Sequence, residues 1–449
     1  MRHLLLLLTA VGLLCTPRQV HAQTVPDTYI QEGLTNNLVL QEKRIALDQS
    51  LLALRSAKSL FLPTTWLEGQ YTLAQGGRSI DIPVGDLLNP VYQTLNQLTN
   101  SHKFPQISNV SEQFLPNNFY DVRVKTTLPI INPDLRFNRA IRQQQTQLAQ
   151  YEIDAYRREL VKEIKVAYYS LLQASKAVVI YQNAMEVVQE NLRVNQALQR
   201  NGKNLPAYIS RSESEVQQVE SQLQQASNNV QNAQAYFNFL LNKPLTDHVD
   251  ILQEETDLVM PALLESDVKG REELQSLKLA AGINTLVDRM NRSYRTPRLN
   301  GFVDLASQGF DFKVNNKSLF YLAGVQVKVP IFTGQRNQIR IEQSGLEGKA
   351  IGLQKKNTEQ QLELSAMVSR NNAVSAYNSY LASQKQLQAS QQYFRLVDKG
   401  YREGINSFIE FLDARTSLTN AQLQTNIQHY KVLAALADFE RQTASYNFK

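Results

Sequence analysis

The segment LVKEIKVAYYSLLQASKAVVIYQNAMEVVQENL, residues 160–192, decides the fold class. Apolar or small side chains recur in it at alternating intervals of four and three residues: Leu160, Ile164, Ala167, Leu171, Ala174, Val178, Tyr181, Met185, Val188 and Leu192. This heptad spacing predicts an α-helix that packs against other helices along one seam. Neither proline nor glycine interrupts residues 134–200, so one helix here would be about 100 Å long.

A second stretch repeats the seam with smaller side chains. Its seam positions are Leu362, Ala366, Ser369, Ala373, Ala376, Tyr380, Ser383, Leu387, Ser390, Phe394 and Val397. Short side chains allow the partner of this second helix to approach more closely. Glutamine and asparagine fill much of the remaining surface of both stretches, which suits the wall of a water-filled tube and equally any solvated coiled coil.

The two long helices belong to a duplicated plan. Gly202 follows Pro129 by 73 residues, and Gly404 follows Pro330 by 74. A further helical pattern follows each glycine, and each half begins with a helical pattern, at residues 26–62 and 265–296. Such internal repetition predicts two structural repeats, residues 23–242 and 265–449, joined by a linker at 243–264.

Four prolines stand where helix and strand are expected to meet. They are Pro63, Pro129, Pro297 and Pro330. Leu128-Pro129-Ile130 and Val329-Pro330-Ile331 are each expected to end a strand and introduce a helix. Asn132 followed by Pro133 reads as an N-cap and a first helical residue, and Thr333 can cap the second copy.

Four segments alternate apolar and polar residues with period two, at 66–73, 120–128, 299–305 and 321–329. They predict strands, either of a half-buried soluble sheet or of a membrane sheet with polar residues inside. The two halves differ in the length of the segment between their two prolines. Pro63 and Pro129 are 66 residues apart, whereas Pro297 and Pro330 are 33 residues apart. The extra sequence is expected to form a long loop at residues 76–118.

The N-terminus has the features of a secretory signal peptide. Arg2 precedes an apolar run that is too short to span a bilayer, and small residues end at Ala22. We therefore expect a signal peptide at residues 1–22, with a short membrane anchor as the alternative. The only cysteine, Cys15, follows Leu14 rather than the small residue that a lipoprotein signal requires, so plain cleavage is favoured.

Export restricts the function classes. Loss of Arg2 and Arg18 would lower the formal net charge from +6 to +4, and the remaining basic residues are scattered among acids. This distribution does not favour nucleic-acid binding. The export signal favours the membrane interpretation of the strands. Four strands cannot close a membrane sheet, so that interpretation requires several chains to share one barrel.

One run carries a family resemblance. In YREGINSFIEFLDAR, residues 401–415, a tyrosine precedes the glycine by three residues and an acid follows it by six, before Leu412-Asp413-Ala414. Together with the duplicated plan and the paired Pro-Ile strand exits, the run resembles the periplasmic turn of the TolC-like outer-membrane efflux proteins, the outer membrane factors. The resemblance covers nearly all of the sequence after the signal peptide.

The resemblance implies a mainly α fold with a small β part. Three protomers would form an α-barrel in the periplasm and share a 12-stranded transmembrane β-barrel in the bacterial outer membrane. The channel would be the exit duct of a tripartite efflux or type I secretion system. Its partners would be a periplasmic adaptor (membrane fusion) protein and an inner-membrane pump. Such a duct needs no cofactor and no catalytic residue.

The resemblance also assigns roles to individual residues. Tyr401, Glu410 and Asp413 would form the periplasmic gate, where a ring of carboxylates favours cations. The tip turns that dock the adaptor would contain Gly202, Asn204, Gly404, Asn406 and Ser407. The family's basic tip residue is Asn406 here, and the acid with which it pairs is replaced by Tyr208. The family's ionic lock is therefore absent.

Simpler interpretations stay open for the same residues. Ser407 and Glu410 form the Ser-x-x-Glu pattern of a capping box, the glycines suit any tight turn, and Asp413 suits a solvated helix. For the whole chain, the alternative is a secreted coiled-coil structural or adaptor protein without a pore. An enzyme is not favoured, because His102, His248 and His429 lack metal-ligand spacing and no catalytic motif is present.

Overall fold

The computed structural model describes residues 27–202, 205–251 and 268–446, together with Val25, Leu258 and Phe448. The predicted signal peptide, Asn204 and most of the predicted linker lie outside these residues. The chain divides into two compact units. The first comprises the described residues within 1–49, 147–281 and 349–449, and the second comprises 50–146 and 282–348.

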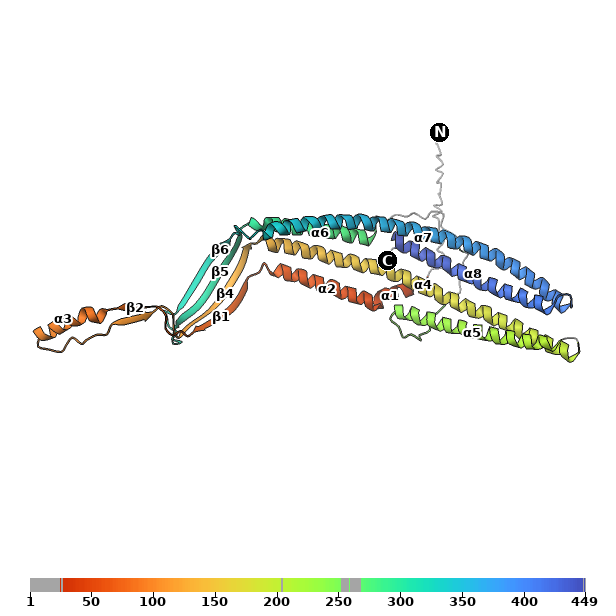
Figure 1. Ribbon diagram of the computed structural model, residues 1–449, viewed down its shortest axis with the longest axis horizontal. Helices are drawn as coiled ribbons and strands as arrows, with labels where there is room; N and C mark the ends of the chain where they lie inside the picture. Colours follow the sequence, from red (N-terminus) through yellow and green to blue (C-terminus); the bar gives the residue numbers. More distant parts are fainter. Residues whose placement is uncertain are drawn as a thin grey trace, which may run out of the picture. The chain divides into compact units, whose positions relative to one another are not determined.

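Long helices dominate the fold (Figure 1). They are α1 (Asp27–Asn36), α2 (Leu38–Ser59), α4 (Pro133–Arg200), α5 (Pro206–Leu240), α6 (Glu272–Arg292), α7 (Arg336–Arg402) and α8 (Phe408–Thr443), with a shorter α3 (Val84–Leu98) and the 3-10 turn η1 (Ser293–Arg295). The paired helices α4 and α7 have 68 and 67 residues, so the duplicated plan is confirmed. Within the described sequence, no helix has the length and apolar character to cross a membrane.

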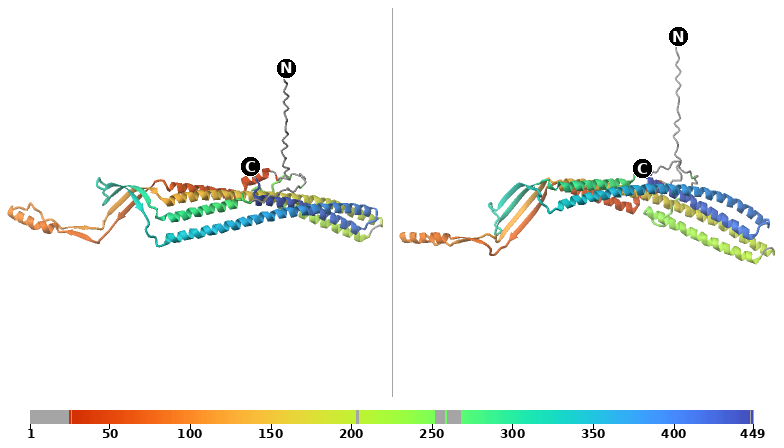
Figure 2. Two further views of the ribbon diagram at one scale, coloured as in Figure 1. Left: turned by 90° about the horizontal axis from the view of Figure 1, so that it is seen from above. Right: turned by 45° about the horizontal axis from the view of Figure 1, so that its top comes forward.

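Two helical hairpins form much of the first unit. Both views of Figure 2 show α4–α5 and α7–α8 side by side, with their two turns at the same end. The main apolar core joins α1, α2, α4, α5 and α8. Its fully buried members include Ile30, Leu160, Ile164, Phe237 and Leu241.

The predicted seam of α4 is confirmed, because every position is buried or half-buried. In its second half Ile180 and Ala184 are buried beside Val188, so the packed face is wider than the predicted seam. The face widens because α4 has neighbours on more than one side. Ala184 packs in a cluster with Val219 of α5, and Asn426 of α8 donates from Nδ2 to the Gln173 carbonyl (2.8 Å).

The seam of α7 is confirmed along its whole predicted length, because every position is buried or half-buried. A second apolar stripe on α7 is exposed. Its members lie at multiples of seven residues: Ile339, Leu346, Leu353, Met367, Val374 and Leu381, which are 41–72% exposed. Among the described residues of one chain, α7 is thus buried mainly along its narrow seam.

Helix starts follow the cap prediction in one repeat only. Asn132 accepts from the Asp134 amide at 3.1 Å and caps α4, with Pro133 as the first helical residue. The prediction for Thr333 is wrong, since its hydroxyl accepts from the Asn337 side chain (2.9 Å). Two residues with φ of +61° separate Thr333 from the first residue of α7, which takes the hydroxyl away from the helix amides.

The second unit contains an antiparallel sheet in the order β1 (Thr64–Thr72), β4 (Phe119–Ile131), β5 (Arg298–Phe310) and β6 (Leu319–Lys328). All four predicted strands are confirmed. The repeats meet at β4 and β5, which pair along their whole length, while β1 and β6 are the two edges.

Three junction prolines lie in connections and one lies inside a strand. Pro63, Pro297 and Pro330 stand between helix and strand, as predicted. Pro129 does not end its strand, because β4 continues to Ile131. The register of β4 against β5 shifts between Pro129 and Ile131. A bulge tolerates proline because it leaves a residue out of the hydrogen-bond ladder.

Residues 76–118 are not simply the predicted loop. They contain β2 (Ser79–Ile82), α3 and β3 (Val110–Gln113), and β2 pairs with β3 as a separate ribbon. The prolines, glycines and asparagines of the segment indicate turns. However, asparagine side chains of α3 bind the returning chain and order it.

Candidate functional site

The two helical turns that the sequence marks by glycine lie at the same end of their hairpins. Gly202 and Gly404 have φ of +69° and +77°, a region that side chains disfavour, so glycine permits both reversals. The Ile405 amide donates to the Gly400 carbonyl at 2.8 Å and closes the end of α7. Asn204 lies outside the described residues, so only one turn is complete.

The α7–α8 turn contains the predicted capping box. Ser407 Oγ accepts from the Glu410 amide (3.2 Å), and Glu410 Oε2 accepts from the Ser407 amide (2.7 Å). Asn406 Nδ2 lies 3.4 Å from the same carboxylate oxygen. The hydrogen bonds from Ser407 hold the pKa of Glu410 below its ordinary value. This carboxylate is thus already bound within its own turn.

Tyr401 lies in an aromatic cluster where the two hairpins meet. Its ring stacks on Phe411 of α8 with 5.0 Å between centroids and contacts Phe408 at 6.2 Å. Tyr208 of α5 packs on Phe408 at 5.1 Å. Burial raises the pKa of Tyr401 above its ordinary value, so the hydroxyl keeps its proton and is a hydrogen-bond donor.

The Tyr401 hydroxyl is hydrogen-bonded to a buried polar network. Tyr401 Oη donates to Asn195 Oδ1 of α4 at 3.0 Å. Asn195 Nδ2 in turn donates to Asn191 Oδ1 (3.0 Å) and to Ser212 Oγ of α5 (2.9 Å). Asn191, Asn195 and Ser212 are all at least 95% buried. The network therefore joins α7 to α4 and α5 without any charged group.

A buried ion pair makes a second connection between the hairpins. Arg415 Nη2 of α8 lies 2.6 Å from Glu215 Oε2 of α5, and both side chains are more than 90% buried. Arg211, which is exposed, contacts the other Glu215 oxygen at 2.8 Å. Burial lowers the pKa of Arg415, and the adjacent Glu215 carboxylate opposes that effect. Within the described chain, Arg415 Nε has no hydrogen-bond partner.

The remaining predicted gate residue, Asp413, is exposed on α8 between the buried Leu412 and Ala414. It lies one helical turn after Glu410, so the two carboxylates share a helix face. Asn406 and Tyr208, which the sequence resemblance aligns with the two ionic-lock positions, are uncharged residues. The turn thus brings Asn406, Ser407 and Glu410 together, whereas Tyr401 packs on Phe408 and Phe411 and Asp413 faces solvent.

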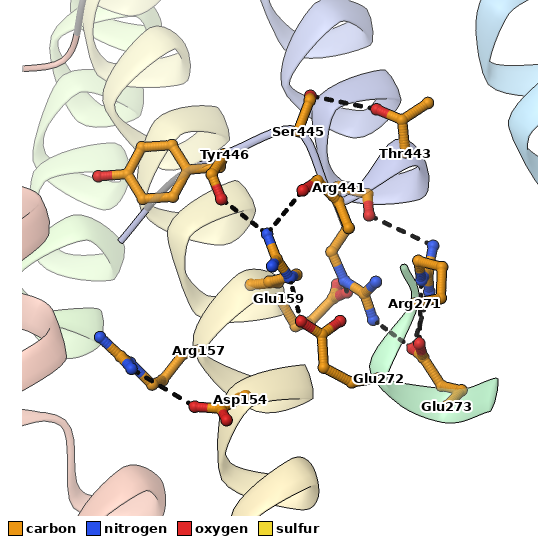
Figure 3. Close-up of polar contacts among 12 residues, drawn as sticks. Asp154, Arg157, Glu159, Arg271, Glu272, Glu273, Arg441, Thr443, Ser445 and Tyr446 are labelled. Carbon is orange, nitrogen blue, oxygen red and sulfur yellow. Dashed lines mark hydrogen bonds and ion pairs between the residues drawn. The ribbon is translucent and has the colours of Figure 1, made fainter. Parts of the chain in front are cut away.

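A charged network, which the sequence did not reveal, joins α4, α6 and α8 (Figure 3). Arg441 lies 3.0 Å from Glu159 and 2.9 Å from Glu273, and Arg271 lies 2.7 Å from Glu273. Burial opposes ionisation of Glu273, but hydrogen bonds from both arginines lower its pKa to about 2. Arg158 pairs with Glu272 at 2.5 Å.

The same network holds the end of the chain. Arg158 Nη1 donates to the carbonyls of Ala444 (3.0 Å) and Tyr446 (2.7 Å) (Figure 3). Its guanidinium also lies 5.0 Å from the Phe448 ring. In the part of the chain that the structure describes, no group of three or more histidine, cysteine, aspartate or glutamate side chains could hold a metal.

Comparisons with known proteins agree with this arrangement. Residues 289–443 match the family model described as outer membrane efflux protein. The outer-membrane channel OprN has a TM-score of 0.75 at 12% identity, over 94% of this chain and 90% of that one. The outer membrane protein VceC from Vibrio cholerae has a TM-score of 0.73 at 14% identity, over 93% and 95%. No curated protein matches the sequence significantly.

The open state of the Neisseria gonorrhoeae outer membrane channel MtrE is similar as well, with a TM-score of 0.72 at 15% identity over 93% of this chain and 88% of that one. The fold is that of an outer-membrane channel protomer with a duplicated helical hairpin. The family model thus matches part of the second repeat, and the similarity to the solved channels extends over nearly the whole chain at the level of the fold.

Proposed function

We propose that three copies of this chain form an outer-membrane channel that serves as the exit duct of a tripartite efflux or type I secretion system. The exposed heptad stripe of α7 is the observation that carries the proposal. Its members Leu346 and Leu353 are 64% and 72% exposed, and Met367 is 53% exposed. Burial of one such side chain contributes about 1.5–3 kcal/mol, so a neighbouring chain gains by covering the stripe.

The sheet supports the same assembly. The edge strands β1 and β6 each pair on one side within the described chain. A free edge presents unpaired amides and carbonyls that favour pairing with another strand. Rotational symmetry places β1 of one copy beside β6 of the next, which satisfies both edges at once.

The two turns supply a docking surface for a periplasmic adaptor, which links the duct to an inner-membrane pump. Three apolar side chains are exposed there, namely Leu205 (62%), Ile405 (76%) and Ile409 (70%). Gly202 and Gly404 permit the turns, and Asn406 and Ser407 order the second one. Because the pump supplies the energy, the duct itself requires no cofactor.

Tyr401, Glu410 and Asp413 are proposed to line the periplasmic gate. In this chain the closed gate is held by the neutral contact Tyr401–Asn195 and the buried ion pair Arg415–Glu215, both between the hairpins, in place of an ionic lock at the turn. Of the two acids, Asp413 has the carboxylate that is free to attract cations, since Glu410 is bound to Ser407.

The mass of the particle that detergent extracts from outer membranes tests the proposal. A trimer has three times the mass of the 51.0 kDa chain, less any cleaved signal peptide. Val374→Lys with Leu381→Lys places charge in the α7 stripe and is expected to reduce the yield of trimer. Gln386→Lys, an exposed position on another face of α7, is the matched control. A monomer in the soluble fraction would contradict the proposal.

A further inference from the structure

The segment between β1 and β4 contains a helix whose two faces are reversed relative to those of an ordinary surface helix. Helix α3 and the ribbon β2–β3 have no counterpart in the second repeat, where only residues 311–318 separate β5 from β6. A surface helix normally packs its apolar face and exposes its polar one. In α3, the packed face carries Asn89 and Asn96 beside Tyr92, whose ring lies 5.7 Å from that of Phe104, and the aliphatic face is exposed.

The packed face of α3 holds the returning chain through side-chain amides. Asn89 donates to the Ile107 carbonyl and accepts from its amide, both at 2.9 Å. Asn96 makes the same pair of bonds with Phe104, at 2.8 and 3.1 Å. Gly85 completes this face, since a Cβ there would lie 2.4 Å from the Ile107 carbonyl oxygen. The exposed face is therefore held rigidly in place.

The apolar face follows a heptad pattern. Val84, Leu88, Val91, Leu95 and Leu98 alternate at intervals of four and three residues, and we call them the α3 seam. Leu88, Val91 and Leu98 are 38%, 51% and 78% exposed, and the adjacent Leu87 is 68% exposed. A seam with this period is complementary to the same seam on another helix.

The charges of α3 favour identical copies over a lipid surface. Helices that lie on membranes carry lysine or arginine on the polar face, and α3 has neither. Its only charged residue, Asp86, accepts from Asn109 Nδ2 (2.9 Å) away from the seam. Around a symmetry axis identical residues meet, so a seam without charge avoids like-charge repulsion.

We propose that the α3 helices of three copies of this chain pack against one another through the α3 seam and form a small helical bundle. The proposal rests on the trimer of the proposed function. The segment leaves the sheet from β1, whose free edge is the proposed contact between copies. Two heptads are too short to associate when free, but tethering on a common body raises their effective concentration to about the millimolar range.

Disulfide cross-linking in intact outer membranes tests the bundle. The full-length chain has one native cysteine, Cys15, within the predicted signal peptide. Val91→Cys, or Leu98→Cys, places a thiol in the seam, and Gln93→Cys places one on the opposite face as the matched control. With oxidant, the seam variants are expected to give covalently linked chains, and Gln93→Cys is expected to remain unlinked.

The outcomes separate the two proposals. Cross-linking of the seam variants, without cross-linking of Gln93→Cys, supports the bundle. Rapid labelling of seam thiols by a water-soluble maleimide, without cross-links, overturns it, because the seam then faces water. Thiols that are protected from this reagent but still do not cross-link also overturn it, since lipid or another protein then covers the seam. If the extracted particle is not a trimer, the proposed function itself fails.

Discussion

The two repeats follow one plan but differ in the contacts that their helices make with α4. In the first repeat, α1 and α5 pack on α4 through buried apolar side chains such as Ile30 and Phe237. In the second repeat, α8 adds Leu433 and Ala437 to the same core, and arginine–glutamate pairs around Glu273 and Glu272 join the start of α6 and the end of α8 to α4 as well. Apolar contacts respond little to pH, whereas ion pairs depend on it.

The turns of the two hairpins differ in a similar way, because the second turn has the more extensive polar side-chain bonds. Helix α5 begins with Pro206 after Leu205 and has no side-chain cap. Helix α8 begins with the Ser407–Glu410 capping box. The contacts from the second hairpin to the first include directional bonds, from Tyr401 to Asn195 and from Arg415 to Glu215. We therefore expect single substitutions in the second hairpin to affect stability and gating more than substitutions in the first.

The largest effect is expected from breaking the buried ion pair. Arg415→Met leaves Glu215 buried, and loss of one partner of such a pair costs about 3–5 kcal/mol. Arg211 still contacts Glu215, so we expect the lower end of this range. Urea unfolding of the detergent-solubilised channel measures the change in free energy of unfolding.

Two further variants show whether burial is the cause. Glu215→Leu with Arg415→Met removes both charges and is expected to restore most of the lost stability. Arg193→Met removes an exposed pair within α4 and is expected to change little. A double variant as unstable as Arg415→Met alone would show that packing, and not charge, holds this contact.

Acid is expected to loosen the second repeat before the first. Because the pKa of Glu273 falls from 4.5 to about 2 on folding, its contribution is present above pH 4.5 and is lost as the pH falls toward 2. At most it amounts to about 3 kcal/mol. The urea midpoint measured from pH 6 to pH 3 reports this loss.

The matched variant is Glu273→Gln. It is expected to be less stable than the parent at pH 6 and to lose less stability as the pH falls. Proteolysis at low pH is expected to begin at residues 444–446, which Arg158 holds, and to spare α1. Cleavage in α1 before residues 444–446 would show that acid loosens the first repeat before the second.

A smaller effect is expected from the neutral contact. Tyr401→Phe keeps the ring stacked on Phe411 but leaves buried Asn195 without its donor, at a cost of about 1–2 kcal/mol. More frequent spontaneous opening in planar bilayers is the expected result. The control is Tyr380→Phe, because the Tyr380 hydroxyl bonds to Gln384 of the same helix. Equal behaviour of the two variants would exclude the network as a closing contact.

The smallest effect concerns ion selectivity. Asp413→Asn is expected to reduce cation preference in bilayer recordings by up to about fivefold, since exposed charges contribute about 0.2–1 kcal/mol. Glu410→Gln is expected to change it less, because that carboxylate is bound to Ser407. Unchanged selectivity in a chain carrying both substitutions would mean that both acids are structural.

The long helices and strands could be predicted because their periods persist over many residues. The cap at Asn132, the capping box at Ser407 and the glycine turns are local patterns and were predicted as well. Helix α3 was not, because the bonds that order it run from asparagine side chains to backbone groups eight to eighteen residues away. The sequence there shows only turn-forming residues.

The contacts that join the hairpins could not be predicted either. Tyr401 meets Asn195 across 206 residues of sequence, and Arg415 meets Glu215 across 200. One signal was present in the sequence, because Asn195 follows the seam residue Leu192 by three residues and so continues the packed face of α4, where a polar residue needs partners. No pattern in the sequence pairs Arg441 with Glu273.

The α7 seam has a consequence for helix register. Where it faces α8, the large side chains of Tyr380, Leu387 and Phe394 alternate with Ser383 and Ser390. Displacement of α7 along α8 by one turn would therefore bring large side chains to positions that now hold serine. Tyr380 meets His429 edge-on with 5.4 Å between ring centroids, and Phe394 lies 5.8 Å from Phe411. This alternation of volumes opposes the sliding of a helix of 67 residues along its neighbour.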